Sequence, residues 1–216
     1  MLLELSEVLA CPRCGPPQVM VAVVHESVGH RVTQGFLGCP TCDSRFPIEE
    51  RAVHLQEQKS GEQPEAPSSS GGPLAAESAM LIGAVLDLAQ GSGYALLGPE
   101  LSEMADAIAS LAERWEVVSL GSVRPADAAQ STNVSRIILP ADGSPPVLPV
   151  LPGRFGAAAL AGDPAPDRVR QYAAALRPLG RLAIVAPGPG SVGALREAGL
   201  DLMAGDERVA VASRKS

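Results

Sequence analysis

The chain has 216 residues, 46% of them hydrophobic, which allows a real core and leaves room for one ordinary domain plus a small one. No apolar run approaches the ~20 residues of a membrane-spanning helix, so we expect no membrane partner. The net charge is −7 and lysine is scarce, which disfavours nucleic acid as a partner because a phosphate-binding surface needs clustered Lys and Arg.

The N-terminal region is expected to be small and rich in β-structure. Leu2 to Leu9 predict a short apolar helix or turn, Val19–Val24 predict a strand, and Arg31–Leu37 predict its partner. Two CxxC pairs bracket these strands, Cys11 with Cys14 and Cys39 with Cys42. Each pair forms a knuckle, and two facing knuckles give the tetrahedral sulfur cage that Zn²⁺ prefers. We therefore expect a structural zinc site with all four ligands from the protein.

Other uses of these residues stay open at this stage. A rubredoxin-like iron site also uses four thiolates, although Asp43 stands where the first knuckle has Gly15. Disulfides would need an oxidising compartment, whereas the N-terminus lacks the basic region and cleavage site of a signal peptide. We expect a cytoplasmic protein with reduced thiols. The three histidines, His25, His30 and His54, could each replace a thiol as a metal ligand. Because four thiols are already present, we interpret the histidines as ordinary surface or strand residues.

The segment around the knuckles carries a family resemblance. It is carried by Leu5, the entry Leu9-Ala10-Cys11-Pro12-x-Cys14, the second knuckle and the following Arg45-Phe46-Pro47-Ile48. In these features the segment resembles the small zinc-ribbon subunit that activates tRNA and protein methyltransferases. The likeness covers about the first 55 residues. It implies a protein-binding module whose usual partner has a methyltransferase fold. We therefore expect a protein partner, with a methyltransferase as the first candidate.

The chain divides once, between residues 56 and 73. This stretch contains Gly, Ser, Pro and Glu and no aliphatic residue larger than alanine, so it cannot bury enough apolar surface to order itself. The sequence predicts a zinc ribbon at 1–55, a flexible linker at 56–73 and a second domain at 74–216.

The second domain alternates helices with strands, which predicts a mostly parallel sheet covered on both faces. Leu81, Val85 and Leu88 form one stripe of a first helix that should end at Gly91. Helical spacing also puts Leu101, Met104, Ile108, Leu111 and Trp115 on one face of a second helix. The remaining predicted helices are 167–177 and 194–198, and the predicted strands are 95–97, 117–120, 136–139, 156–161, 181–185, 200–203 and 208–212, the last two pairing as an antiparallel edge element.

This order of elements resembles a Rossmann-like S-adenosylmethionine methyltransferase from the first helix to the C-terminus. The local likeness is strongest over Tyr172 to Leu182, at the predicted helix, turn and strand. The fold class is therefore α/β: a four-cysteine ribbon followed by a Rossmann-like, methyltransferase-type sheet with an antiparallel edge hairpin.

The resemblance also marks cofactor candidates. Asp87, Gly91 and Gly93 match the acid and spaced glycines of the family's cofactor loop. Asp142 stands where an adenine-contacting acid is expected, and a turn residue before Gly143 is the alternative interpretation. That loop has to follow the first strand and open the next helix, so that backbone N–H groups reach the ligand. We place Asp87 in the first helix instead. The loop after the first strand then has a single glycine, Gly98, followed by proline, which has no N–H to donate.

No acid ends the second predicted strand, which runs into Ser119-Leu120-Gly121-Ser122, and we assign no catalytic residue. S-adenosylmethionine binding is therefore doubtful, and zinc is the one cofactor expected. The sequence favours a zinc-binding interaction or regulatory protein with a non-catalytic methyltransferase-like domain. The alternative is an active S-adenosylmethionine-dependent methyltransferase with a built-in zinc-ribbon activator, in which Asp87, Gly91, Gly93, Gly98 and Asp142 contact the cofactor.

Overall fold

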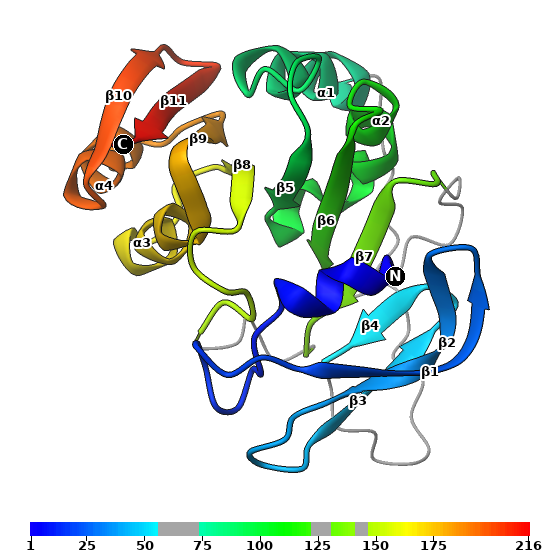
Figure 1. Cartoon of the computed structure of the whole chain (residues 1–216). Coiled ribbons are helices and arrows are strands. Elements are labelled where there is room, and N and C mark those ends of the chain that lie inside the picture. Colours follow the sequence, from blue (N-terminus) through cyan, green and yellow to red (C-terminus); the bar gives the residue numbers. More distant parts are fainter. Residues whose placement is uncertain (56–73, 122–130, 141–146) are drawn as a thin grey trace. The chain divides into compact units, whose positions relative to one another are not determined.

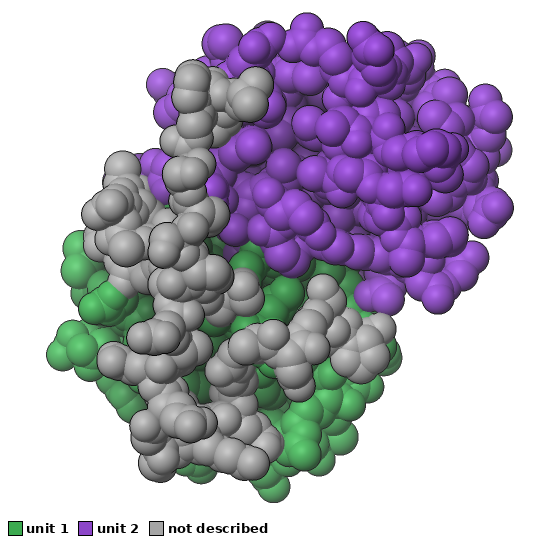
Figure 2. Space-filling view, turned by 180° about the vertical axis from the view of Figure 1, so that it is seen from behind, with its two compact units in different colours: residues 1–70, 120–128, 135–151 green, residues 71–119, 129–134, 152–216 purple. Residues whose placement is uncertain are grey.

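A computed structural model describes residues 1–55, 74–121, 131–140 and 147–216. The chain forms two compact units, drawn in different colours in Figure 2. Unit 1 takes residues 1–70, 120–128 and 135–151, and unit 2 takes residues 71–119, 129–134 and 152–216. None of the helices in the described ranges has the length and apolar character needed to cross a membrane.

Unit 1 is built on the strands around the cysteines, as Figure 1 shows in blue and cyan. Four strands in chain order form an antiparallel meander, and a fifth joins its end. The helix or turn expected near the N-terminus and the two expected strands are present, although the first strand begins at Val21 and continues to Val28. The elements are the 3-10 helix η1 (Leu3–Glu7) and the strands β1 (Val21–Val28), β2 (Arg31–Gly38), β3 (Arg45–Glu49), β4 (Ala52–His54) and β7 (Val134–Ile138).

The fifth strand, β7, comes from far along the chain. It pairs in parallel with β4, with Val53 opposite Ile137, and the Leu55 N–H donates to the Ile138 carbonyl at 2.9 Å. The segment after β7 also contacts the N-terminal residues, because Leu9 and Val150 form an antiparallel bridge. Residues 135–151 fall, in sequence, inside the segment predicted as the methyltransferase-like domain. Unit 1 therefore joins the ribbon to a strand from beyond the linker, while the division at 56–73 itself stays a prediction.

Unit 2 has the predicted alternation of helices and strands. Its strands run in the order β6-β5-β8-β9-β11-β10; the first four are parallel, β11 is antiparallel to β9, and β10 is antiparallel to β11. This is the expected α/β, Rossmann-like sheet with an antiparallel edge hairpin. The elements are α1 (Leu74–Val85), β5 (Gly93–Leu97), η2 (Pro99–Met104), α2 (Ala105–Ser110), β6 (Trp115–Gly121), β8 (Phe155–Ala161), α3 (Pro166–Ala175), β9 (Leu176–Val185), α4 (Ser191–Glu197), β10 (Leu200–Gly205) and β11 (Val209–Arg214).

Alternate residues of these strands face opposite layers of unit 2. Ala95, Leu97, Val117, Ala157 and Ala159 are fully buried in one core cluster with residues of α1 and α2. The intervening Leu96, Val118 and Ala158 are also fully buried, so these three strands are covered on both faces. Figure 1 shows α3 beside α4, and these two helices contact each other, as do α1 and α2.

Two helix predictions are wrong in detail. The second helical segment ends at Ser110, so Leu111 is 41% exposed and Trp115 starts strand β6 instead of lying on the helix face. The apolar spacing that suggested a longer helix belongs in part to the turn and strand that follow. The first helix ends at Val85, so Asp87 lies beyond it, at a φ of +59°.

Candidate functional site

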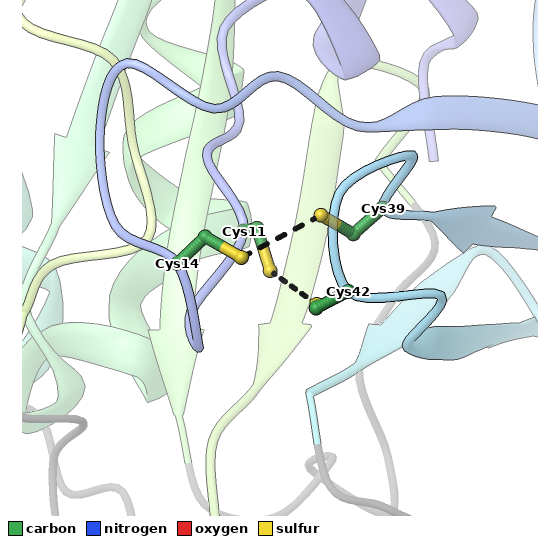
Figure 3. Close-up of side chains that lie close together, drawn as sticks. All are labelled: Cys11, Cys14, Cys39 and Cys42. Atoms are coloured by element: carbon green, nitrogen blue, oxygen red, sulfur yellow. Dashed lines mark hydrogen bonds between the residues drawn. The ribbon is translucent and has the colours of Figure 1, made fainter.

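The four cysteines come together as the sequence predicts. Figure 3 shows the two knuckles facing each other, with the sulfurs of Cys11 and Cys42 3.7 Å apart and those of Cys14 and Cys39 3.8 Å apart. Four sulfurs each about 2.3 Å from a central zinc lie about 3.8 Å from one another in an ideal tetrahedron. All four sulfurs lie within 4.8 Å of one another. The thiols are therefore positioned to hold a zinc ion, with every ligand position supplied by the protein.

The two knuckles share one backbone design. In the first, the Gly15 N–H donates to the carbonyl of Cys11 at 2.8 Å, and Gly15 has a φ of +71°. In the second, the Asp43 N–H donates to the carbonyl of Cys39 at 3.0 Å, with Asp43 at a φ of +53°. Aspartate tolerates this left-handed conformation better than most residues. The missing second glycine, which stood out in the sequence, therefore does not change the turn.

The thiols of the cluster have very different affinities for protons. The Ser44 hydroxyl, 3.2 Å from the Cys42 sulfur, is the main cause that lowers the pKa of Cys42 to about 6, with the Ser44 backbone N–H as the second. Burial raises the pKa of Cys11. Hydrogen bonding to Cys42, followed by burial, raises the pKa of Cys14 to about 12. Metal binding requires all four as thiolates, so it must release protons from the cluster.

The histidines do not join this cluster. The imidazole of His25 makes an edge contact with Phe36, with ring centroids 5.9 Å apart, and His30 lies 3.5 Å from a carboxylate oxygen of Glu4. His54 lies on β4. Within the described part of the chain, the metal-ligand group that contains the knuckles consists of cysteines alone.

The cofactor candidates lie at opposite ends of strand β5. Asp87, Gly91 and Gly93 come before or at the start of this strand, whereas Gly98 follows its last residue. Five residues of extended chain span about 16 Å. Ligands of open α/β sheets bind outside the carboxyl ends of the strands, where Gly98 lies. Asp142 is outside the described residues, and cofactor contact by any of these residues stays a prediction.

Asp87 lies in the turn that ends helix α1. The Leu88 N–H donates to the Gly83 carbonyl and the Asp87 N–H to the Ala84 carbonyl, which is the hydrogen-bond pattern of a Schellman motif with Asp87 in the left-handed position. Arg181 completes this end of α1: it donates to the Val85 carbonyl at 3.2 Å and lies 3.7 Å from the Asp87 carboxylate. A cation at a helix C-terminus is favourable. The acid that resembles a cofactor ligand therefore has a structural role.

The loop at the carboxyl end of β5 is held by side chains of the protein itself. The Gly98 N–H donates to the Ala159 carbonyl at 2.9 Å, and Pro99 has no N–H. The Glu100 carboxylate then makes a bidentate pair with Arg168 of α3, at 2.5 and 2.9 Å. A side-chain carbon on residue 98 would lie 2.8 Å from Leu160 and 2.9 Å from the Glu100 carboxylate. The Gly98 N–H and the space next to the end of the strand are therefore occupied by groups of the protein itself.

Sequence reasoning missed Asp163, an exposed carboxylate just after β8. Its Oδ1 accepts a hydrogen bond from the Ser191 hydroxyl at 3.2 Å. A side-chain carbon on Gly188 would lie 2.5 Å from Asp163, and one on Gly190 would lie 3.2 Å from its carboxylate. The stretch Gly188-Pro189-Gly190 thus lies against this carboxylate. An acid directly after a parallel strand was the available signal.

Comparisons with known proteins give distant structural likenesses. No family model matches the chain, and no curated protein matches it. The chain is similar to a 1,6-didemethyltoxoflavin-N1-methyltransferase of Burkholderia thailandensis, solved with S-adenosylhomocysteine, at 18% identity over 66% of this chain and 79% of that one, with a TM-score of 0.48. It is also similar to the [4+2]-cyclase SpnF, at 16% identity over 60% and 58% of the two chains and a TM-score of 0.47. A third likeness is to the tRNA (m1A58) methyltransferase TrmI of Aquifex aeolicus, at 15% identity over 65% and 69% and a TM-score of 0.44. The strand order of unit 2, and not these neighbours, carries our assignment of the fold.

Proposed function

We propose that this chain is a zinc-binding interaction or regulatory protein, in which the metal holds a ribbon that is bound to strand β7 of the same chain and the methyltransferase-like unit does not turn over S-adenosylmethionine. The thiol geometry supports a structural zinc site rather than a catalytic metal site, because no ligand position is left for water or substrate. Net acidity supports a protein rather than a nucleic acid as the partner.

The main argument that this chain does not turn over S-adenosylmethionine comes from the loop after β5. A cofactor at the carboxyl end of a parallel sheet depends on backbone N–H groups that point at it. Here the Gly98 N–H is used by a neighbouring strand, Pro99 has none, and Glu100 is paired with Arg168. Binding a nucleoside cofactor would require this loop to open and the ion pair to break.

The pairing of β4 with β7 supports a ribbon that acts within its own chain. The resemblance noted above implies a partner of methyltransferase fold, and β7 lies in the segment with that resemblance. The ribbon's edge strand β4 is thereby already paired. Any second protein must then use another surface of the ribbon or of unit 2.

An active methyltransferase with a built-in activator is the second candidate, and Asp163 is the described feature that favours it. An exposed carboxylate after β8 lies at the edge of the sheet where ligands of this fold bind. Such a group could accept a proton from a substrate or hold its amino group.

Isothermal titration calorimetry of the zinc-loaded chain with S-adenosylmethionine and S-adenosylhomocysteine separates the two candidates. We expect no saturable heat at millimolar ligand. A dissociation constant in the low micromolar range would contradict the proposal. Loss of that binding in Asp87→Ala or Gly91→Val would locate the cofactor at the segment before β5, whereas loss in Asp163→Ala would locate it at the carboxyl ends of the strands.

A further inference from the structure

A shallow pocket of about 540 Å³ opens beside the second knuckle of unit 1. It is lined by two arginines, an aromatic ring, a proline and residues of the knuckle. One acid, Asp43, also lines it, so the cationic side chains outnumber the anionic one. Its wall also includes Arg13, Phe36, Ser44, Arg45 and Pro47.

Arg45 presents its charge to this pocket. Its guanidinium lies over the Phe36 ring, 5.1 Å from the centroid, and the His25 ring also contacts Phe36, at an edge-on angle. Among the described residues, the Arg45 guanidinium makes no hydrogen bond or ion pair. Stacking on an aromatic ring fixes the plane of a guanidinium while leaving its N–H donors available for an anion.

Arg13 reaches the same pocket from the first knuckle. It donates to the Ser44 hydroxyl at 3.1 Å, and Ser44 is only 7% exposed. The hydroxyl in turn lies 3.2 Å from the Cys42 sulfur. Ser44 therefore holds Arg13 at the pocket wall, and metal binding and the position of this arginine are structurally linked.

We propose that this pocket binds a carboxylate-bearing, acidic segment of a protein partner, with Arg13 and Arg45 as the anion ligands and Phe36 and Pro47 as the apolar wall. The inference rests on the proposed interaction function and names the chemistry of the partner. Each of the two guanidinium groups that line the pocket can donate a pair of N–H groups to the two oxygens of a carboxylate. A nucleic acid is the poorer fit, because two arginines do not make the clustered basic surface that binding a phosphate backbone needs. The β4 edge is paired with β7, which leaves this pocket among the surfaces of the ribbon that a second protein can reach.

Fluorescence anisotropy with the intact, zinc-loaded chain tests the site. The probe is a labelled glutamate-rich peptide that contains one phenylalanine, and the matched probe has every glutamate replaced by glutamine. We expect binding of the first probe alone, weakened at high salt. Arg45→Ala and Arg13→Ala should each weaken it about tenfold or more, since a charged hydrogen bond is lost. Arg154→Ala, which removes an exposed arginine from unit 2, is the matched control and should leave the affinity unchanged.

Zinc analysis of each preparation keeps this inference separate from the proposed function. If the wild-type chain binds no zinc, the proposed function fails. If it holds zinc but binds both peptides equally, or neither of them, the pocket inference fails alone. An equal loss of affinity in Arg154→Ala would also overturn it, because the attraction would then be unspecific. Binding of inorganic phosphate or an oligonucleotide in preference to the acidic peptide would assign the pocket to a different anion.

Discussion

The indole ring of Trp115 lies against the α-carbon of Gly156, so that a side-chain carbon on residue 156 would stand 2.8 Å from two ring atoms. The same ring borders Gly91 and Gly93, and its Nε1 donates to the Gln90 carbonyl at 3.0 Å. Three glycines thus make room for one buried indole at the start of β5, β6 and β8. Two of them are the glycines that resemble a cofactor loop.

Replacing Gly156 by alanine should destabilise unit 2. A methyl group would overlap the Trp115 ring, and overpacking of this kind costs about 1–3 kcal/mol. The melting temperature of the variant should fall by several degrees. Gly193→Ala is the matched control: residue 193 is exposed in α4 with nothing near its added carbon, so this change should stabilise the chain by about 0.5–1 kcal/mol. Equal effects of the two substitutions would contradict the packing described here.

Short-range sequence patterns predicted most of the elements but missed their ends. The helix α1 ends in a Schellman motif with Asp87 in the left-handed position, a place usually taken by Gly or Asn, so the composition gave no stop signal. Trp115 follows a turn at helical spacing and therefore looked like one more apolar residue of a helix.

Loss of one thiol should remove the metal and unfold the ribbon. Cys39→Ser takes away a buried ligand, and a small ribbon has too little apolar core to fold well without its metal. Elemental analysis should give about one zinc per wild-type chain and almost none for the variant. Ser27→Ala, on exposed strand β1, is the control and should keep the zinc. Iron in the purified wild-type protein, or a variant with an intact ribbon, would contradict the structural zinc site.

The cysteine cluster was predictable and the remainder of the candidate site was not, for a physical reason. Two CxxC motifs fix four ligands within two tight turns, so local spacing carries the information. Glu100 and Arg168 are 68 residues apart, and Val53 of β4 pairs with Ile137 of β7 across an even longer stretch of sequence. Pairs of this kind depend on how the whole sheet is assembled, and a three-residue strand such as β4 has almost no signal of its own.

The Glu100–Arg168 pair should contribute modestly to stability and strongly to the rigidity of the loop after β5. The two side chains are 40% and 27% exposed, so solvent screens them and we expect a coupling free energy of about 0.5–1 kcal/mol. A double-mutant cycle with Glu100→Gln and Arg168→Gln measures it by urea unfolding. Arg170→Gln on the same helix is the control. A coupling of zero would contradict a stabilising role for this ion pair.

The turn between β10 and β11 should weaken in acid. The N–H groups of Val209 and Arg208 donate to the Asp206 carboxylate at 2.8 Å each, and they lower the pKa of this group. Because the folded pKa lies below the unfolded one, the stabilisation is complete above the unfolded pKa, about 3.9, and disappears as the pH falls through the folded pKa.

The variant Asp206→Asn measures this contribution. It should melt below the wild-type protein at pH 7, and the difference between the two melting temperatures should shrink as the pH drops below about 4. A difference that stays constant from neutral pH to strong acid would show that the carboxylate charge does not stabilise the turn. Glu207→Gln, an exposed neighbour, controls for the loss of one negative charge.

Hydrogen exchange at β4 and β7, with zinc and after chelation, tests most directly whether the metal-held ribbon and this distant strand form one unit. The Leu55 N–H, which donates to the Ile138 carbonyl, is the reporter because it lies on the pairing between them. With zinc bound, Leu55 and the amides of β7 should be protected. Chelation should unfold the ribbon and accelerate exchange at both, while β8 and β9 of unit 2 keep their protection. Unchanged protection of Leu55 and β7 in the metal-free protein would contradict a metal-dependent ribbon bound to its own chain.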